Sequence, residues 1–407
     1  MKAFGPGDPG SRAGAAPPQE EQPPALGPED GQFEGPESDD VESRMLFNRK
    51  RLATSAIVVA VILVALYFVL PELAGLEDSL RKIEDADPVW IAIALGFNLL
   101  SFAAYIALFR GILGGRSVTP EVRDRIDLRT SYQVTLAGLA ATRLFSAGGA
   151  GGIALTYWAL RRAGMGPRET ASRMVAFLVL LYTIYLVALV VCGIGLRVGI
   201  FPGPSPVGMT IVPAGLAGAA LIIVLGVSLI PTDLERIVAR WARGHRRVRL
   251  ARRIASIPAT IATGARVALS LMRHPSSGLL AVSGAIGFWA ANICVLWACF
   301  HSFGESVPTA VLVQGFFVGM AANLLPFFPG GVGSVDAGMI AAFLAFGEPS
   351  STVFVSVLAY RVIAFWLPIP PGILAYLQLR RTVARWREED APPRPARVEP
   401  EASPRHV

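Results

Sequence analysis

Two arginines stand in otherwise apolar sequence, and they are the side chains best suited to do chemistry. Arg143 comes just before the glycine-rich string SAGGAGG, and Arg361 lies inside the last long apolar run. A charge at membrane depth is unfavourable unless it faces a cavity or a partner. We expect Asp336 to pair with Arg361, which would leave Arg143 to bind an anionic headgroup. In the alternative interpretation, both arginines only tie hairpins to neighbouring helices.

Two glycine-rich strings could add backbone donors: SAGGAGG at 146–152 and PFFPGGVGS at 326–334. A helix interrupted inside a membrane leaves backbone N–H groups free, and a helix N-terminus favours an anion such as phosphate. Ser334 is predicted to be the N-cap of the returning helix. The two tyrosines and the asparagine added below are weaker candidates, because polar groups in a helix bundle more often join helices. The candidate substrate-binding residues are Arg143, Gly148, Gly149, Gly151, Tyr157, Asn323, Gly330, Gly331, Gly333, Ser334, Asp336, Tyr360 and Arg361.

Other chemistries lack their usual patterns. GAGGIA at 149–154 fits a dinucleotide-binding fingerprint, but that motif needs a preceding β-strand, and a membrane helix is expected here. The string GGVGS lacks the Lys-Ser/Thr pair of a phosphate-binding loop. The four histidines and three cysteines show no metal-ligand spacing. We therefore predict no catalytic residues, no metal and no cofactor, and a protein that is not an enzyme.

The elements that must position these residues are membrane helices. The chain has 407 residues, 53% hydrophobic and only 16% charged, whereas soluble domains carry about 25% charged residues. Its net charge of +7 indicates cytoplasmic loops rather than nucleic-acid binding. The fold class is an all-α polytopic membrane protein. About six full spans are predicted from apolar runs of sufficient length, at roughly 52–70, 90–113, 174–196, 211–230, 278–300 and 352–379.

Two shorter apolar stretches are predicted to be re-entrant hairpins. Segment 129–163 is too short to cross twice, and both of its ends are rich in arginine, so it should enter and leave on one side. Segment 307–347 lies between Glu305 and Glu348, so it should enter from the opposite side. Basic residues before the first span and after the last predict that both termini are cytoplasmic, in a bacterial inner membrane.

The two hairpins fit an internal repeat. A shift of 182 residues superposes Gly148 on Gly330 and Gly151 on Gly333. Each hairpin stands between two spans, so the repeat units are about 90–196 and 278–379, in opposite orientations. Inverted repeats with interrupted helices are typical of transporters, with a substrate site near the membrane midplane.

Outside this transmembrane domain, at 46–382, the composition changes. Segments 1–45 and 383–407 are rich in proline and acidic residues, and we predict that both are disordered cytoplasmic tails. The Arg-rich segment 231–275 is predicted to be a cytoplasmic loop. It is either an amphipathic helix on the inner leaflet, beginning near Ile237, or a solvated loop.

Three strings resemble the lysylphosphatidylglycerol synthase transmembrane family, also called flippase-like integral membrane proteins. They are RLFSAGGAGGIALTYWALRRAGM (143–165), LLPFFPGGVGSVDAGMIAAFLAFG (324–347) and YRVIAFWLPIPPGILA (360–375). The resemblance covers about 50–382 and implies a bundle that moves lipids across the bilayer. The family often has Glu where Asp336 stands here. Many members place an acidic residue after the first glycine loop, where this chain has Gly152, Ile153 and Ala154.

The resemblance does not extend to a soluble synthase domain, since nothing after residue 382 could fold into one. The leading hypothesis is a flippase for an anionic or aminoacylated phospholipid, or a transporter of a lipid-linked substrate, that works without ATP hydrolysis. Its partners would be membrane lipids and not nucleic acid. The alternative is a non-transporting subunit that recruits a lipid-modifying or glycosyl-transferring membrane enzyme through residues 232–275.

Overall fold

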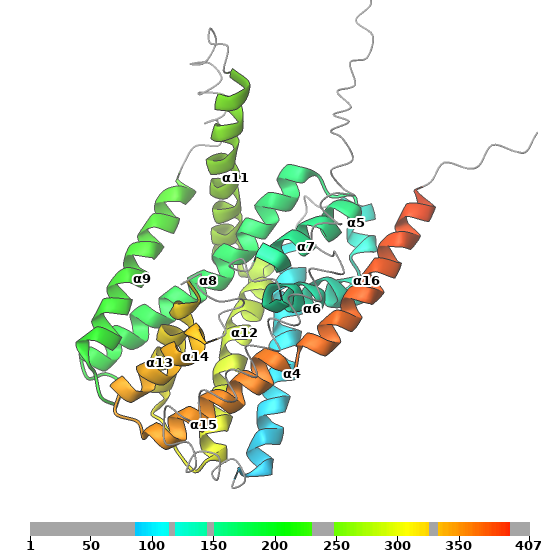
Figure 1. The fold of residues 1–407 in the computed structure, drawn as a ribbon. Helices are drawn as coiled ribbons and strands as arrows, with labels where there is room; N and C mark the ends of the chain where they lie inside the picture. The colour runs from blue at the N-terminus through cyan, green and yellow to red at the C-terminus, as the bar shows by residue number, and fades with distance from the viewer. Residues whose placement is uncertain (1–85, 114–118, 145–149, 230–247, 325–332, 391–407) are drawn as a thin grey trace, which may run out of the picture. The chain divides into compact units, whose positions relative to one another are not determined.

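The computed structural model describes residues 86–113, 119–144, 150–229, 248–324 and 333–390, and every regular element there is helical (Figure 1). In chain order they are α4 (Pro88–Leu113), α5 (Pro120–Arg125), α6 (Leu128–Leu144), α7 (Ala150–Arg162), α8 (Pro167–Arg197), α9 (Val207–Ser228), α11 (Val248–Arg273), α12 (Pro275–Ser302), α13 (Thr309–Ala321), the 3₁₀ turn η1 (Ala322–Leu324), α14 (Ser334–Ala345), α15 (Ser350–Arg361), the π-helical turn η3 (Val362–Trp366) and α16 (Ile369–Glu389).

Within the described residues, five helical segments are long and apolar enough to cross a membrane. They are Pro88–Leu113, Pro167–Arg197, Val207–Ser228, Gly278–Ser302 and Ser350–Glu389. These segments match five of the predicted spans and confirm a polytopic all-α protein. The predicted span at 52–70 and the predicted tail at 1–45 lie outside the described residues.

Helices α4 and α12 form an antiparallel pair that runs through the bundle (Figure 1). Near one end, a Cβ atom on Gly111 of α4 would collide with the backbone of Ala281 in α12. At the other end, the Asp87 amide donates to the Ser302 carbonyl over 2.9 Å. Because small residues let two backbones approach closely, α4 and α12 are closely packed along their length. It gives the two hairpins a common support.

The first hairpin is formed by α6 and α7, which pack on each other. A Cβ on Gly152 of α7 would collide with the Gly138 carbonyl of α6, so glycine permits the close crossing. The chain enters this hairpin after α5 and leaves it at Gly164, where a Cβ would lie 3.6 Å from Val122 of α5. The hairpin therefore enters and leaves at the same end of the bundle, as predicted.

The second hairpin is formed by α13, η1 and α14. A Cβ on Gly319 of α13 would collide with Met339 of α14. The chain reaches this hairpin from the C-terminal end of α12, and near its exit the Phe343 ring lies 5.1 Å from the Phe300 ring of α12. The two hairpins thus begin at opposite ends of the α4–α12 pair. The tips at 145–149 and 325–332 lie outside the described residues.

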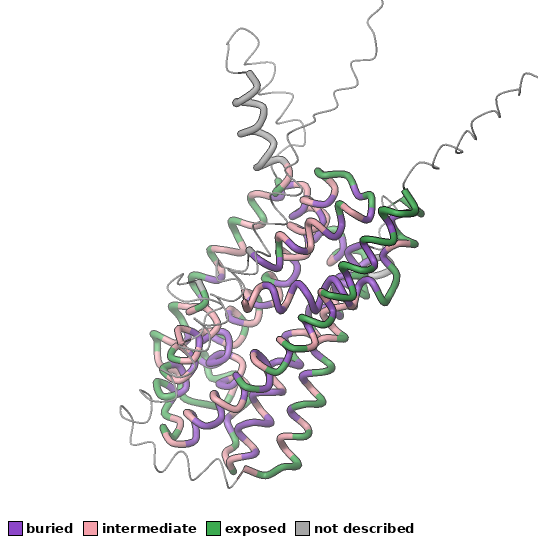
Figure 2. Tube along the Cα trace, turned by 45° about the vertical axis from the view of Figure 1, so that its right-hand side comes forward, coloured by how far each residue is buried: buried purple, intermediate pink, exposed green. Residues whose placement is uncertain are grey.

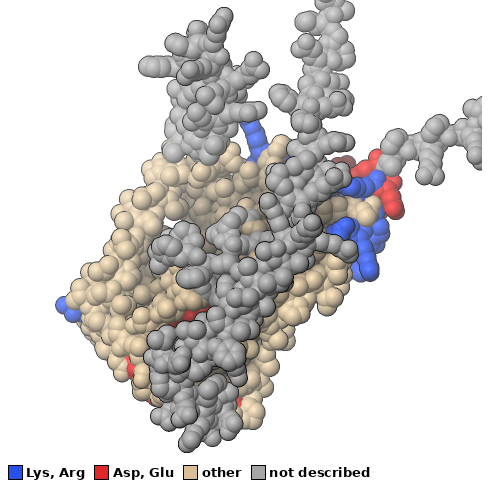
Figure 3. Space-filling model, viewed as in Figure 1, with Lys and Arg blue, Asp and Glu red and all other residues tan. Residues whose placement is uncertain are grey.

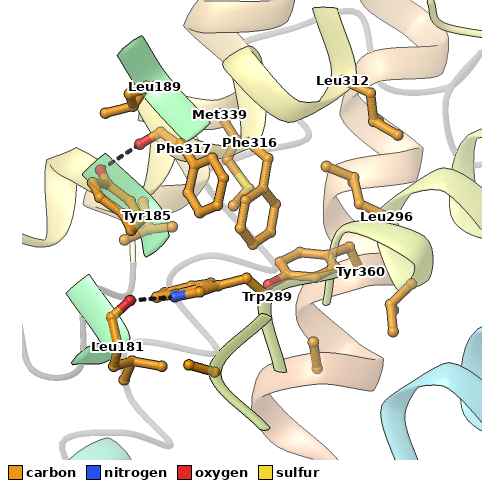
Figure 4. Close-up of a cluster of buried hydrophobic side chains, with 14 of the residues drawn as sticks. Leu181, Tyr185, Leu189, Trp289, Leu296, Leu312, Phe316, Phe317, Met339 and Tyr360 are labelled. Atoms are coloured by element: carbon orange, nitrogen blue, oxygen red, sulfur yellow. Dashed lines mark hydrogen bonds between the residues drawn. The ribbon is translucent and has the colours of Figure 1, made fainter. Parts of the chain in front are cut away.

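Each hairpin packs on the last helix of the other repeat unit. Helix α6 lies against α16, where the Thr382 hydroxyl donates to the Gln133 side-chain oxygen over 3.0 Å. Helix α13 lies against α8, where the Tyr185 hydroxyl donates to the Phe317 carbonyl over 2.7 Å (Figure 4). This reciprocal exchange is what an inverted repeat with a two-fold relation requires.

An aromatic core joins the two units beside the second hairpin. Figure 4 shows Trp289 of α12, Phe316 and Phe317 of α13 and Tyr360 of α15 gathered in one cluster. The Trp289 indole donates to the Leu181 carbonyl over 2.8 Å, so its polar atom is satisfied inside the core. The second hairpin is therefore anchored by dense apolar packing.

The outer helices expose apolar side chains, as a lipid-facing surface does. On α9, Leu216 is 70% exposed and Ile222 is 72% exposed. Figure 2 shows exposed positions along the outer helices, and buried positions between them. On the face shown in Figure 3, most of the described charged side chains gather around α5 and the C-terminal end of α16. The rest of the described surface seen in Figure 3 is largely uncharged, which suits hydrocarbon.

Of the two interpretations of segment 231–275, the helix is confirmed for the second half, and the solvated loop is wrong there. Residues Val248–Arg273 form the long helix α11, and its last turns pack on α8. Ala262 and Ala265 are buried there, and Gly264 touches Val175 of α8. Small residues on one face allowed a close helix crossing, which the density of arginines obscured. Residues 230–247, including the predicted start at Ile237, lie outside the described part.

The predicted disordered tail at 383–407 begins too early. Helix α16 continues to Glu389, with Val383 and Trp386 buried. Their spacing extends the apolar stripe of α16 toward α6, so the helix remains packed beyond the membrane span. Residues 391–407 lie outside the described part.

Candidate functional site

The last span is broken at its centre by a π-helical turn and three prolines. In η3 the Leu367 amide donates to the Val362 carbonyl over 2.9 Å, so the hydrogen bond skips the Ile363 carbonyl. Pro368 follows and has no N–H to donate to the Ala364 carbonyl, four residues earlier. Two successive carbonyls therefore lose their α-helical donors inside the bundle.

Side chains from the first repeat unit donate to both carbonyls. The Asn98 amide nitrogen of α4 donates to the Ile363 carbonyl over 3.0 Å. The Arg143 guanidinium, in the last turn of α6, donates through Nη2 to the Ala364 carbonyl over 2.8 Å. Buried carbonyls need such partners, because an unsatisfied one costs about 1–3 kcal/mol. The break is thus held by residues far away in sequence.

One aromatic ring brings the two predicted arginines together. The Arg361 guanidinium lies 4.3 Å from the centre of the Phe365 ring, and the Arg143 guanidinium lies 5.5 Å from it. The face of an aromatic ring attracts cations. Phe365 therefore stabilises two like charges that would otherwise repel each other at this depth.

The second hairpin contributes a carboxylate to the same cluster. Asp336 Oδ1 lies 2.5 Å from Arg361 Nε, which confirms the predicted ion pair. The other oxygen, Oδ2, accepts a hydrogen bond from the Gly333 amide over 2.8 Å. Asp336 thus closes the start of α14 and neutralises Arg361 at the same time.

The predicted N-cap at Ser334 is wrong by one residue. Gly333 is the N-cap, with a φ of +81°, and Ser334 is the first residue of α14. A positive φ favours glycine strongly over serine, but the sign of φ is not visible in the string GGVGS. The Ser334 hydroxyl is instead buried, with no hydrogen-bond partner among the described residues.

Arg143 keeps one end of its guanidinium unpaired. Its Nη1 atom is buried and has no hydrogen-bond partner among the described residues. The ionisable groups nearest to it are Tyr360, Arg361 and Tyr105. A buried cation with an idle donor is unusual, because such groups are normally paired. Arg143 therefore has one buried donor that no described residue uses.

A small pocket of about 70 Å³ opens between α4, α6, α7 and α8, and Arg143 is not among the residues that line it. Its walls are mainly apolar, with a few polar side chains. Those polar lining residues are Tyr105, Thr135, Thr142, Thr156 and Arg173. Thr142 directly precedes Arg143, and Tyr105 is an electrostatic neighbour of that arginine. Sequence reasoning missed this pocket, although the seven-residue spacing of Thr135 and Thr142 places both on one face of α6.

Arg173 closes the far side of this pocket and is already engaged. Its Nη1 atom donates to the Ile112 carbonyl over 2.6 Å, and its Nη2 atom lies 3.7 Å from Glu169. Arg173 therefore ties the start of α8 to the end of α4.

Comparison with known proteins assigns the chain to a family. The family described as "Lysylphosphatidylglycerol synthase TM region" matches residues 55–372, more than three quarters of the chain. The chain belongs to this family. The match confirms the resemblance and a multi-pass membrane protein, and it includes the whole cluster from Asn98 to Phe365.

Relatives of this lysylphosphatidylglycerol synthase transmembrane family member carry general names. A "UPF0104 membrane protein" of Methanothermobacter thermautotrophicus is 24% identical over 336 residues, which cover 78% of this chain and 93% of the relative. A UPF0104 membrane protein of Methanocaldococcus jannaschii is 28% identical over 92 residues, which cover 23% of this chain and 27% of the relative. These names state membrane association and no activity.

The glycine candidates of this family member lie mostly outside the described residues. Those outside are Gly148, Gly149, Gly330 and Gly331. Gly151 is buried in the first turn of α7, and its neighbour Gly152 lines the pocket.

The three weaker candidates do not gather at one place. Tyr360 is buried in α15, with its ring 5.8 Å from the Phe316 ring, and it is an electrostatic neighbour of Arg143. Tyr157 is half-buried on α7 and is not among the pocket's lining residues. Asn323 is exposed in η1. Only Tyr360 therefore joins the arginine cluster.

Proposed function

We propose that this protein is a lipid flippase, or a transporter of a lipid-linked substrate, that moves an anionic or aminoacylated phospholipid between the two leaflets. One observation carries the proposal. Where both hairpins meet the broken last span, Arg143 holds an unpaired, buried donor next to the Arg361–Asp336 pair. Charged groups inside membrane proteins usually mark a substrate path, because their burial is otherwise unfavourable.

The architecture supports the same proposal. Two inverted units, each with a re-entrant hairpin, resemble the organisation of transporters that bind substrate between their repeats. The small pocket between α4, α6, α7 and α8 has mainly apolar walls, which suit a short part of a lipid chain. No nucleotide-binding motif is present in the sequence, so we propose transport without ATP hydrolysis.

We further propose a bacterial cytoplasmic membrane, with both termini in the cytoplasm. The end of α16 carries Arg380, Arg381, Arg385 and Arg387. Positive residues near span ends favour the cytoplasmic side. The entrance of the first hairpin, close to α5, would then lie on that side.

Reconstitution tests the proposal. The purified full chain is placed in liposomes that contain a trace of fluorescent phosphatidylglycerol, and a membrane-impermeant reductant bleaches the outer leaflet. We expect wild-type protein to expose inner-leaflet lipid, and Arg143→Gln to abolish the exchange. Arg110→Gln is the matched control, since Arg110 is exposed at the end of α4. Exchange no faster than in empty liposomes, or full activity of Arg143→Gln, would refute the proposal.

The partner-subunit alternative remains a prediction. It rests on segment 232–275, and the second half of α11 is built into the bundle against α8. Affinity purification of the full chain distinguishes the two functions. A stoichiometric membrane enzyme bound to a chain that exchanges no lipid would favour the partner role.

A further inference from the structure

The charges at the broken span do not cancel. Two guanidinium groups, Arg143 and Arg361, share the Phe365 ring, and one carboxylate, Asp336, joins them. Both oxygens of Asp336 are engaged, one by Arg361 and one by the Gly333 amide. The cluster therefore carries a net charge of +1, from two positive groups and one negative group.

No other acid among the described residues neutralises Arg143. Its ionisable neighbours besides Arg361 are Tyr105 and Tyr360, and a phenol with an ordinary pKa of about 10 is uncharged at neutral pH. The nearest acid to Arg173, on the far side of the pocket, is Glu169, and it belongs to that arginine.

The two undescribed segments that directly follow Arg143's helix and precede Gly333 contain no acid. Residues 145–149 read Phe-Ser-Ala-Gly-Gly, and residues 325–332 read Leu-Pro-Phe-Phe-Pro-Gly-Gly-Val. Among the described residues and these two segments, one positive charge is thus left over inside the bundle, where an unpaired charge is unfavourable.

We infer that this site selects a lipid headgroup with a single negative charge and no amine: a phosphodiester monoanion of the phosphatidylglycerol type. The inference rests on the proposed function and narrows its substrate class. One phosphodiester charge brings the cluster to neutrality. An aminoacylated headgroup adds ammonium groups that face two guanidiniums, and like charges repel strongly where the dielectric constant is low. A dianion would leave one negative charge in excess.

Two idle donors belong to residues next to the ion pair. Arg143 Nη1 and the Ser334 hydroxyl are both buried without hydrogen-bond partners among the described residues. Each belongs to a residue adjoining the ion pair, because Ser334 is two residues before Asp336 and Arg143 shares a ring with Arg361. A phosphodiester presents two non-bridging oxygens, which suits donors from two sides.

A headgroup comparison tests the inference. The full chain is reconstituted in phosphatidylcholine liposomes with one fluorescent tracer at a time: phosphatidylglycerol, lysyl-phosphatidylglycerol, phosphatidylethanolamine or phosphatidic acid. We expect phosphatidylglycerol to exchange about tenfold faster than the lysylated lipid, a ratio equivalent to about 1.4 kcal/mol. Equal or faster exchange of the lysylated lipid would overturn the inference and leave the flippase proposal standing. No exchange of any tracer would overturn both.

Charge variants supply a second, independent measurement. Asp336→Asn raises the net charge of the cluster to +2, so its preference should move from phosphatidylglycerol toward phosphatidic acid. Arg143→Lys keeps the charge and should keep the preference for a monoanion, whereas Arg143→Gln should lose it. Melting in detergent identifies any variant that fails to fold, and the two Arg143 variants decide the question if Asp336→Asn is among these. A Lys variant that behaves like the Gln variant would contradict a role for charge.

Discussion

The two hairpins share one architecture but differ in how their polar groups are used. In the second hairpin, Asp336 caps α14 and pairs with Arg361, and the helices pack without space at Gly319. In the first hairpin, Arg143 lies in the last turn of α6 and has one guanidinium nitrogen without a partner among the described residues, and a pocket lies between this hairpin, α4 and α8. The second hairpin is therefore satisfied internally, and the first is not.

This difference predicts that the two hairpins have different roles. The second hairpin holds the broken span through an ion pair and an aromatic core. The first hairpin has an unpaired donor, Arg143, and a small pocket. Substitutions in the second hairpin should therefore act mainly on folding, and substitutions in the first mainly on transport. Three sets of variants test this contrast, and a fourth concerns an ion pair outside both hairpins; they follow in order of expected effect.

The largest effect should follow from Asp336→Ala. It leaves the buried Arg361 charge without its carboxylate, which costs about 3–5 kcal/mol for a buried pair. Asp336 remains 22% exposed, so we expect the lower end of that range. Thermal melting in detergent measures the loss, and Asp336→Glu should retain most of the stability. A melting temperature equal to that of wild type would show that the second hairpin does not depend on this pair.

A smaller loss should follow from Gly319→Ala. The added Cβ meets the backbone of Met339, which cannot give way easily, so we expect about 1–3 kcal/mol of destabilisation. Gly152→Ala should cost about as much, because its Cβ would lie 2.5 Å from the Gly138 carbonyl oxygen in α6. Gly218→Ala, with no atom near its Cβ, is the control and should not destabilise. A loss for Gly152→Ala much smaller than that for Gly319→Ala would show that the first hairpin relaxes more easily than the second.

Arg143→Gln should lower stability by only about 1 kcal/mol while it abolishes exchange. The variant weakens the hydrogen bond to the Ala364 carbonyl but also removes an unpaired buried charge, and these changes oppose each other. Melting and lipid exchange measured on the same preparation separate the two effects. A large loss of stability with intact exchange would make Arg143 a structural residue.

The smallest effect concerns the ion pair between Arg125 and Asp390, outside the membrane spans. A hydrogen bond from Arg125 holds the pKa of Asp390 below its ordinary value of 3.8. Its stabilisation is thus present above that value and is lost as the pH falls through the lowered pKa of the folded state. Wild type and Asp390→Asn should differ slightly in melting temperature at pH 7 and converge below pH 3.8. A difference that persists in acid would exclude this carboxylate as its source.

Much of this arrangement could be predicted from the sequence. Apolar run lengths and the signs of their flanks predicted the spans and both hairpins. The pair of Asp336 with Arg361 followed from the rule that buried charges need partners. These predictions depend on composition and on local spacing, which a single sequence displays.

The rest depends on backbone geometry and on distant contacts. The bond from Arg143 to the Ala364 carbonyl joins residues 221 positions apart, and it exists because a π-helical turn and Pro368 free that carbonyl. Residue types alone predict neither the π-helical turn nor the positive φ of Gly333. A helix in the region of α11 was one of the two predictions, but its packing against α8 was not predicted, because the arginines indicated a position at the membrane surface.

Arg143 has two possible partners, the Ala364 carbonyl and a bound anion. The guanidinium that would bind an anion is also the donor that fastens the broken helix to the first hairpin. A ligand that draws Arg143 toward itself weakens that fastening, so α16 gains freedom to tilt about its prolines. By thermodynamic linkage, a tilt of α16 that moves the Ala364 carbonyl away from Arg143 would in turn raise the affinity of Arg143 for the ligand. Ligand binding by Arg143 would thereby change the tilt of α16.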